Sequence, residues 1–204
     1  MSNQVTLVSG QEIDLGVPDF TGVSLETIGL MLYRQLRYNG ATARAYCVLE
    51  HTVRGARACL DPEQSPGLGA YGRTVAKHFL MHDAHEIVTG DISSPVIREI
   101  GKDRVDRLKH RLDLAIYDRF AVEPMTDMIR EMVIAVDQAM FQREWIDLMP
   151  VTFDRAAPGG HDTGPSRDFM LLHGIYPTVI DNHYRRPGYD LVGEFCHLWR
   201  EVNR

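Results

Sequence analysis

The stretch FLMHDAHEIVTGDISSP, residues 79–95, begins with apolar residues that a fold should bury and continues with ionisable ones. His82, Asp83, His85 and Glu86 fall within five positions of it. Burial of an unpaired charged group is costly, so such groups need partners inside a protein. The stretch therefore predicts a helix whose buried face contains both apolar residues that pack in the core and ionisable residues that can bind a partner or take part in chemistry.

Helical spacing places part of this charge on the inward face. In the helix expected over residues 71–88, the apolar face of Val75 and Phe79 continues with His82 and Asp83. Such a face is typical of a core, and a lone inward His or Asp is usually a satisfied structural residue. An inward His and an inward Asp next to each other favour a bound ion that both residues contact.

Two further expected helices carry residues of the same kind. His51 lies on an apolar face of a helix over residues 46–60, and Asp137 lies on one over residues 126–148. Two imidazoles and two carboxylates suit manganese, cobalt, iron, nickel or zinc better than calcium or magnesium. Glu86, one turn beyond the His82 pair, would stand beside such an ion as a general base.

The remaining pattern is also helical. Further helices are expected over residues 24–37, 96–120 and 189–202. The segments QVTLV and EIDLG, residues 4–8 and 12–16, flank a Ser-Gly turn signal and can form a small hairpin. We expect an all-α helical bundle with a small N-terminal β-hairpin. Residues 1–150 would form the main domain, and residues 151–204 a loop and a C-terminal helix that packs on it.

Composition narrows the functional classes. The chain has 204 residues, with 22 basic and 28 acidic ones and a net charge of −6, which argues against a nucleic-acid partner. Its three cysteines have no C-x-x-C spacing, so neither a disulfide framework nor a cysteine zinc site is expected. Neither a signal peptide nor a long apolar run is evident. We expect a cytoplasmic protein without a membrane partner.

The order His51, then His82-Asp83, then Asp137, each on its own helix, resembles the HD-domain metal-dependent phosphohydrolases. LRYNGATARAYCVLEHTV, residues 36–53, resembles the Arg-aromatic segment and first-histidine helix of that family. HDAHEIVTGDISSPV resembles the subgroup that contains bacterial 5′-deoxynucleotidases and phage deoxynucleotide hydrolases. The N-terminal segment is similar to the phage members, which include dATP triphosphohydrolases.

The resemblance implies the metal-site roles. His51, His82, Asp83 and Asp137 would be the metal ligands, holding cobalt, manganese or zinc. Glu86 would be the catalytic acid/base that activates water.

It also implies the substrate contacts. Arg37 would contact phosphate, and Tyr38 would lie near the sugar and base. Asp91 would contact the deoxyribose or organise water and phosphate, and so shares the catalytic assignment. Pro95 would pack against the base.

One position departs from the pattern of the family. Relatives often carry a lysine two residues after this proline, where this chain has Ile97. Arg98 follows and could replace the cation from a different helical angle. The contacts to the phosphate chain depend on this substitution.

The activity implied by the resemblance is hydrolysis of a deoxynucleotide at the α-phosphate, with dATP converted to deoxyadenosine and triphosphate. A 5′-deoxynucleotidase that releases phosphate from deoxynucleoside monophosphates is the alternative within the class. From another class, the alternative is a non-catalytic metal-binding bundle or nucleotide sensor. Relatives also imply a homo-oligomer, in the host cytoplasm if the chain is phage-encoded.

Two other histidines are weaker candidates. His161-Asp162 repeats the dipeptide in a Gly- and Pro-rich segment, with no helix to fix its geometry. His85 points away from the ligand face. We interpret it as a supporting or interface residue, with a second metal as the lesser alternative.

Overall fold

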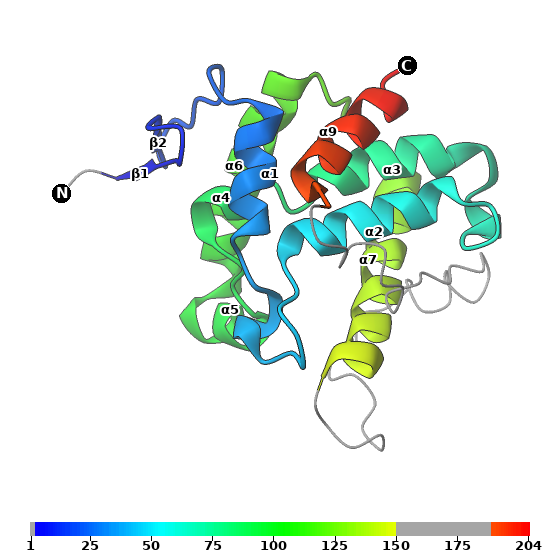
Figure 1. Ribbon diagram of the computed structural model, residues 1–204. Coiled ribbons are helices and arrows are strands. Elements are labelled where there is room, and N and C mark those ends of the chain that lie inside the picture. The colour runs from blue at the N-terminus through cyan, green and yellow to red at the C-terminus, as the bar shows by residue number, and fades with distance from the viewer. Residues whose placement is uncertain (1–2, 150–188) are drawn as a thin grey trace.

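The computed structural model describes residues 3–149 and 189–204, and the fold of these residues is mainly helical (Figure 1). The elements in chain order are β1 (Gln4–Thr6), β2 (Glu12–Asp14), α1 (Leu25–Tyr33), α2 (Val48–Leu60), α3 (Gly72–Met81), α4 (Glu86–Thr89), α5 (Ser94–Ile100), α6 (Lys102–Phe120), α7 (Asp127–Leu148) and α9 (Leu191–Val202). Short 3₁₀ turns occupy Arg37–Gly40 and Pro66–Tyr71. None of the described helices is both long and apolar enough to cross a membrane.

The N-terminal hairpin is confirmed. β1 and β2 pair in antiparallel register, with Val5 opposite Ile13. Gly10 adopts a φ of 83° in the turn between them, a conformation that favours glycine. Ile13 is fully buried, so one side chain of the hairpin joins the main core.

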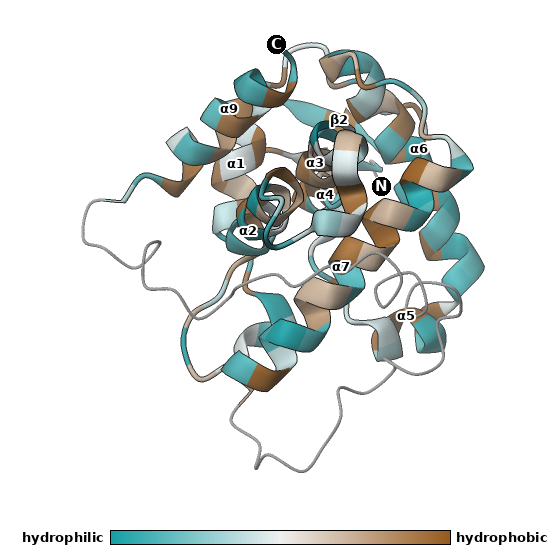
Figure 2. Cartoon of the chain, turned by 90° about the vertical axis from the view of Figure 1, so that its right-hand side faces the viewer, coloured by the Kyte–Doolittle hydropathy of each residue, from teal (hydrophilic) through white to brown (hydrophobic). Residues whose placement is uncertain are grey.

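The core forms around α2 and α3, which pack along each other and also contact α7 and α9. In Figure 2 hydrophobic segments gather around these central helices, whereas the outer side of α6 is mostly hydrophilic. The close approach of α2 and α3 depends on Gly55, because a Cβ there would lie 2.1 Å from the Phe79 ring. α9 packs on α1, α2 and α3, so the C-terminal helix belongs to the same body. His161 and Asp162 lie outside the described residues.

Side-chain caps fix where several helices begin. Ser24, Thr126 and Asp190 each accept a hydrogen bond from a backbone N–H in the first turn of α1, α7 and α9. The expected start near Ser24 is therefore confirmed.

The expected continuation of that first helix to residue 37 is wrong. α1 ends at Tyr33, and the chain then pairs with the segment before α2, as Leu36 forms a β-bridge with Cys47. The Arg37 N–H donates to the Tyr46 carbonyl oxygen and the Val48 N–H donates to that of Gln35, so this segment pairs across the bridge instead of continuing the helix. The prediction failed because this pairing joins segments that helical periodicity does not relate.

The single helix expected over residues 71–88 is also wrong, because α3 ends at Met81 and α4 begins at Glu86. Between them the N–H groups of His82, Ala84 and Glu86 bond to carbonyls three residues back, as in a 3₁₀ turn. The tighter winding changes the angle between successive side chains. The break therefore falls on the proposed ligands themselves.

The helix expected over residues 96–120 is likewise divided. α5 ends at Ile100 and α6 begins at Lys102, with Gly101 between them at a φ of 107°. Glycine adopts such angles readily, so the chain turns there without strain. The helix over residues 126–148 is confirmed as α7.

We expect Gly55→Ala to lower the free energy of unfolding by about 1–3 kcal/mol, because overpacking against Phe79 outweighs the gain in helix propensity. Chemical denaturation would measure the change. Gly29→Ala in α1 is the less crowded comparison and should cost less stability, since its Cβ would lie 3.1 Å from a Val192 methyl group and 3.3 Å from the Phe195 ring. A Gly55→Ala protein as stable as the wild type would contradict the close helix packing.

Candidate metal centre

Four ligand-type atoms converge between α2, the turn after α3, and α7. The Nε2 atoms of His51 and His82 lie 3.4 Å apart. Asp83 Oδ2 lies 3.1 Å from His82 Nε2 and 3.9 Å from His51 Nε2. Asp137 Oδ1 lies 3.2 Å from His51 Nε2 and 3.8 Å from His82 Nε2. Atoms that each lie about 2.0–2.2 Å from one ion are separated by about 3–4 Å. The ligand atoms of His51, His82 and Asp83 all lie within 4.8 Å of one another, so these three residues could hold a metal ion, and Asp137 lies against both imidazoles.

Both imidazoles are oriented by their other ring nitrogen. His51 Nδ1 lies 2.6 Å from Glu144 Oε1, and His82 Nδ1 lies 2.6 Å from the Phe79 carbonyl oxygen. These partners are acceptors when the Glu144 carboxylate is ionised, so each Nδ1 carries the hydrogen. The Nε2 atoms of the neutral rings are then bare acceptors that face each other. Such an arrangement is the one in which proteins present histidine to a metal.

Electrostatics also favours a positive charge at this position. Burial opposes the charged form of all four groups. Nevertheless Asp83 and Asp137 raise the pKa of His82 well above its ordinary value, and the pKa of His51 is also raised. The two imidazoles in turn lower the pKa of Asp83 and that of Asp137. Without a metal, protons supply the compensating charge, and a cation would displace them.

Glu144 is a residue of the candidate site that the sequence interpretation missed. Its carboxylate is fully buried and accepts hydrogen bonds from Arg37 Nε at 3.1 Å, from Tyr38 at 2.8 Å and from Tyr46 at 2.8 Å, in addition to His51. Burial opposes ionisation, but Arg37 and His51 lower the pKa of Glu144 to about 2. This ionised carboxylate therefore links a proposed ligand to the proposed phosphate-binding residue.

A sequence signal for Glu144 did exist. It follows Asp137 by seven residues, which places both on one face of α7 with Phe141 between them. The sequence prediction used only Asp137 on that face and did not extend it to Glu144.

The segment between α1 and α2 brings two predicted substrate residues to the cluster. Arg37 Nη1 lies 3.6 Å from Asp83 Oδ2. Tyr38 adopts a left-handed φ of 56°, and its ring lies 6.1 Å from Phe141 and 6.2 Å from Trp145, centroid to centroid. An aromatic group thus stands beside the charged cluster.

Two acidic residues lie close by in a different electrostatic state. Glu86 is buried, and burial together with Asp83 and Asp91 raises its pKa to about 9. Burial and Asp83 also raise the pKa of Asp91, against the opposing effect of Arg37. Gln35 Nε2 donates to the Glu86 carbonyl oxygen at 2.8 Å and holds this turn against the end of α1. A carboxyl with a raised pKa next to ionised ones is suited to proton transfer.

Pro95 and Arg98 lie on α5, and both are exposed. Among the described residues, no hydrogen bond, ion pair or ring contact joins either side chain to the cluster. Their substrate roles stay predictions.

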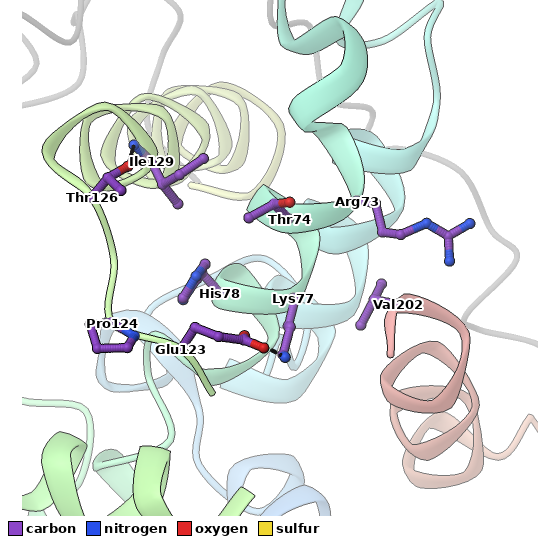
Figure 3. Close-up of a pocket in the computed structure, with 9 residues that line it drawn as sticks. All are labelled: Arg73, Thr74, Lys77, His78, Glu123, Pro124, Thr126, Ile129 and Val202. Carbon is purple, nitrogen blue, oxygen red and sulfur yellow. Dashed lines mark hydrogen bonds and ion pairs between the residues drawn. The ribbon is translucent and has the colours of Figure 1, made fainter. Parts of the chain in front are cut away.

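A separate hollow of about 330 Å³ lies between α3, the start of α7 and the end of α9 (Figure 3). His78, Thr126 and Val202 are among the residues that line it, and none of the residues of the cluster does. Lys77 at its edge is paired with Glu123 at 2.6 Å. The candidate chemistry therefore belongs to the His-Asp cluster and not to this hollow.

No protein-family model matches the chain. Over 118 residues it is 36% identical to an uncharacterized protein of Rhodobacter capsulatus, and the match covers 57% of this chain and 57% of that relative. Because that relative is itself uncharacterized, a function has to be inferred from the geometry of the site.

We expect Glu144→Gln to weaken the binding of Mn²⁺ about 10–100-fold, because the neutral amide orients His51 less firmly. Calorimetric titration of the metal-free protein would measure the affinity. Glu50→Gln is the matched control. Glu50, on α2, is buried like Glu144, but its carboxylate pairs with Arg44 and Arg54 instead of a proposed ligand. An equal loss of affinity in both variants would contradict a specific role for Glu144.

Metal binding should strengthen as the pH rises through the neutral range. The raised pKa values of His51 and His82 mean that protons compete with the ion, and each proton released makes the affinity rise about tenfold per pH unit. Titrations in buffers with different ionisation enthalpies would count the released protons. An affinity that is independent of pH, with no proton release, would refute the assignment of these nitrogens as ligands.

Proposed function

We propose that the chain is a divalent-metal phosphohydrolase of the HD-domain type that cleaves deoxynucleotides at the α-phosphate, with dATP as the favoured substrate. The observation that carries this proposal is the convergence of His51, His82, Asp83 and Asp137 from separate elements, in the chain order of that family. An array of two imidazoles and two carboxylates suits cobalt, manganese or zinc.

Those four residues would hold the ion. When bound, it supplies Lewis-acid polarisation of a phosphate oxygen and lowers the pKa of a coordinated water. Four protein ligands can satisfy a structural site on their own, so the case for catalysis depends on the groups around them.

Arg37 and Glu86 are those groups. Arg37 would neutralise phosphate charge, since its guanidinium lies next to Asp83 and is held there by Glu144. Glu86 would take a proton from the attacking water in its ionised form, which a cation bound beside it would favour against the effect of burial, and its raised pKa makes it a stronger base than an ordinary carboxylate. The bond from the water oxygen to the α-phosphorus forms, the bond to the 5′ oxygen breaks, and the proton passes to that oxygen.

The nucleoside would lie toward the neighbouring segments. Tyr38 with Phe141 and Trp145 offers aromatic surface beside the cluster, and Asp91 lies close enough to Glu86 to raise its pKa. Pro95 would contact the base. The choice of dATP, a homo-oligomeric assembly and a cytoplasmic location all rest on the resemblance to the phage proteins.

Hydrolysis should be lost in Glu86→Gln while the ion held by His51, His82, Asp83 and Asp137 stays bound. A fall of at least about 100-fold is expected, because general acid/base catalysis commonly contributes that much or more. The assay is a panel of deoxynucleoside triphosphates and monophosphates with Mn²⁺ or Co²⁺, with the products separated by chromatography. Triphosphate and deoxyadenosine should form from dATP.

Two variants control this assay. Glu131→Gln, on an exposed position of α7, should keep wild-type activity, and Asp137→Ala should lose metal and activity together. Full activity of Glu86→Gln would refute the catalytic assignment. Phosphate release from dAMP with dATP untouched would favour the 5′-deoxynucleotidase. Metal binding without turnover of any nucleotide would favour a non-catalytic bundle or sensor.

A further inference from the structure

A second group of ligand-type atoms lies beside the first. A ring nitrogen of His85 and carboxylate oxygens of Asp83 and Glu86 lie within 4.8 Å of one another. His85 and Glu86 are each only 4% exposed. This group shares Asp83 with the cluster of His51 and His82.

His85 is oriented in the same way as His51. Its Nδ1 lies 2.9 Å from Asp113 Oδ1 on α6, just as Glu144 holds His51 from α7. A carboxylate that accepts from Nδ1 leaves Nε2 as the atom available to a ligand. A second acidic residue, distant in sequence, thus orients an imidazole ring.

Two polar atoms of this group have no protein partner. His85 Nε2 and Glu86 Oε2 are buried, and neither makes a hydrogen bond within the part of the chain that the structure describes. Buried polar atoms are nearly always satisfied, and leaving one without a partner costs about 1–3 kcal/mol. Two such atoms in one turn, next to an ionised Asp83, are explained together by a bound cation.

We propose that Asp83, His85 and Glu86 hold a second divalent cation, with the Asp83 carboxylate shared between the two ions. One imidazole and two carboxylates form a harder donor set than that of the first site, which suits Mn²⁺. The site stands on its ligand geometry. Its catalytic meaning rests on the proposed function, where two neighbouring cations would clamp the phosphate undergoing attack. Glu86 has two carboxylate oxygens, so one can bind the cation while the other faces water.

Counting bound ions tests this inference without any substrate. The metal-free full-length protein is dialysed against Mn²⁺, and the bound metal per chain is determined by elemental analysis. Two ions per chain are expected, at a separation of about 3.5–4 Å that couples their electron paramagnetic resonance signals. One ion at saturation, or two uncoupled ions, would overturn the proposal.

Matched variants assign the second ion. His85→Ala should bind one ion and lose the coupled signal, whereas His110→Ala, an exposed histidine on α6, should keep both. If His85→Ala does not fold, Asp113→Asn should lower the affinity of the second ion about 10–100-fold and leave the first unchanged. Two coupled ions with unchanged affinities in the folded variant tested would refute the site. Two coupled ions without hydrolysis of any nucleotide would refute the proposed function alone.

Discussion

The hydrogen bond between Glu144 and His51 is the interaction on which the candidate site depends. It fixes the tautomer and direction of a histidine that is fully buried, and it does so with a carboxylate that is fully buried as well. A buried carboxylate without partners would be strongly destabilising, yet this one is ionised because Arg37 and three other donors surround it. Removing any partner would therefore affect α2, α7 and the Arg37–Gly40 turn together. One carboxylate therefore positions His51, the Arg37 guanidinium and the Tyr38 ring.

Helical periodicity predicted the main elements and the inward faces well, because burial of an apolar stripe determines both. α2, α7 and α9 lie where the pattern placed them, and Ser24 begins α1 through the expected cap. The same periodicity placed His51 on α2 and Asp137 on α7 on faces that meet in space, whereas His82 and Asp83 lie in the turn after α3 and not on the predicted helix. The predictions that succeeded did so because each used only the spacing of residues within one helix or one hairpin turn.

The predictions that failed concern features that the spacing of residues within one helix does not determine. The end of α1 depends on pairing between Leu36 and Cys47, and the break after Met81 depends on local 3₁₀ bonding at His82. Propensity does not distinguish that tight turn from one more turn of α-helix. The acidic partners of the histidines were missed for a related reason. Glu144 lies 93 residues from His51 and Asp113 lies 28 residues from His85, so only the packing of whole helices joins them.

The turn after α3 brings the side chains of two neighbouring residues together. Asp83 Oδ2 lies 3.1 Å from His82 Nε2 in a turn whose backbone N–H groups bond to carbonyls three residues back. Such a turn concentrates acceptors that repel one another unless a positive charge lies among them. A cation bound there would hold α2, α7 and the end of α3 together, because it binds the assembled ligands and not the unfolded chain. Metal binding and the stability of this part of the fold would then be one linked equilibrium.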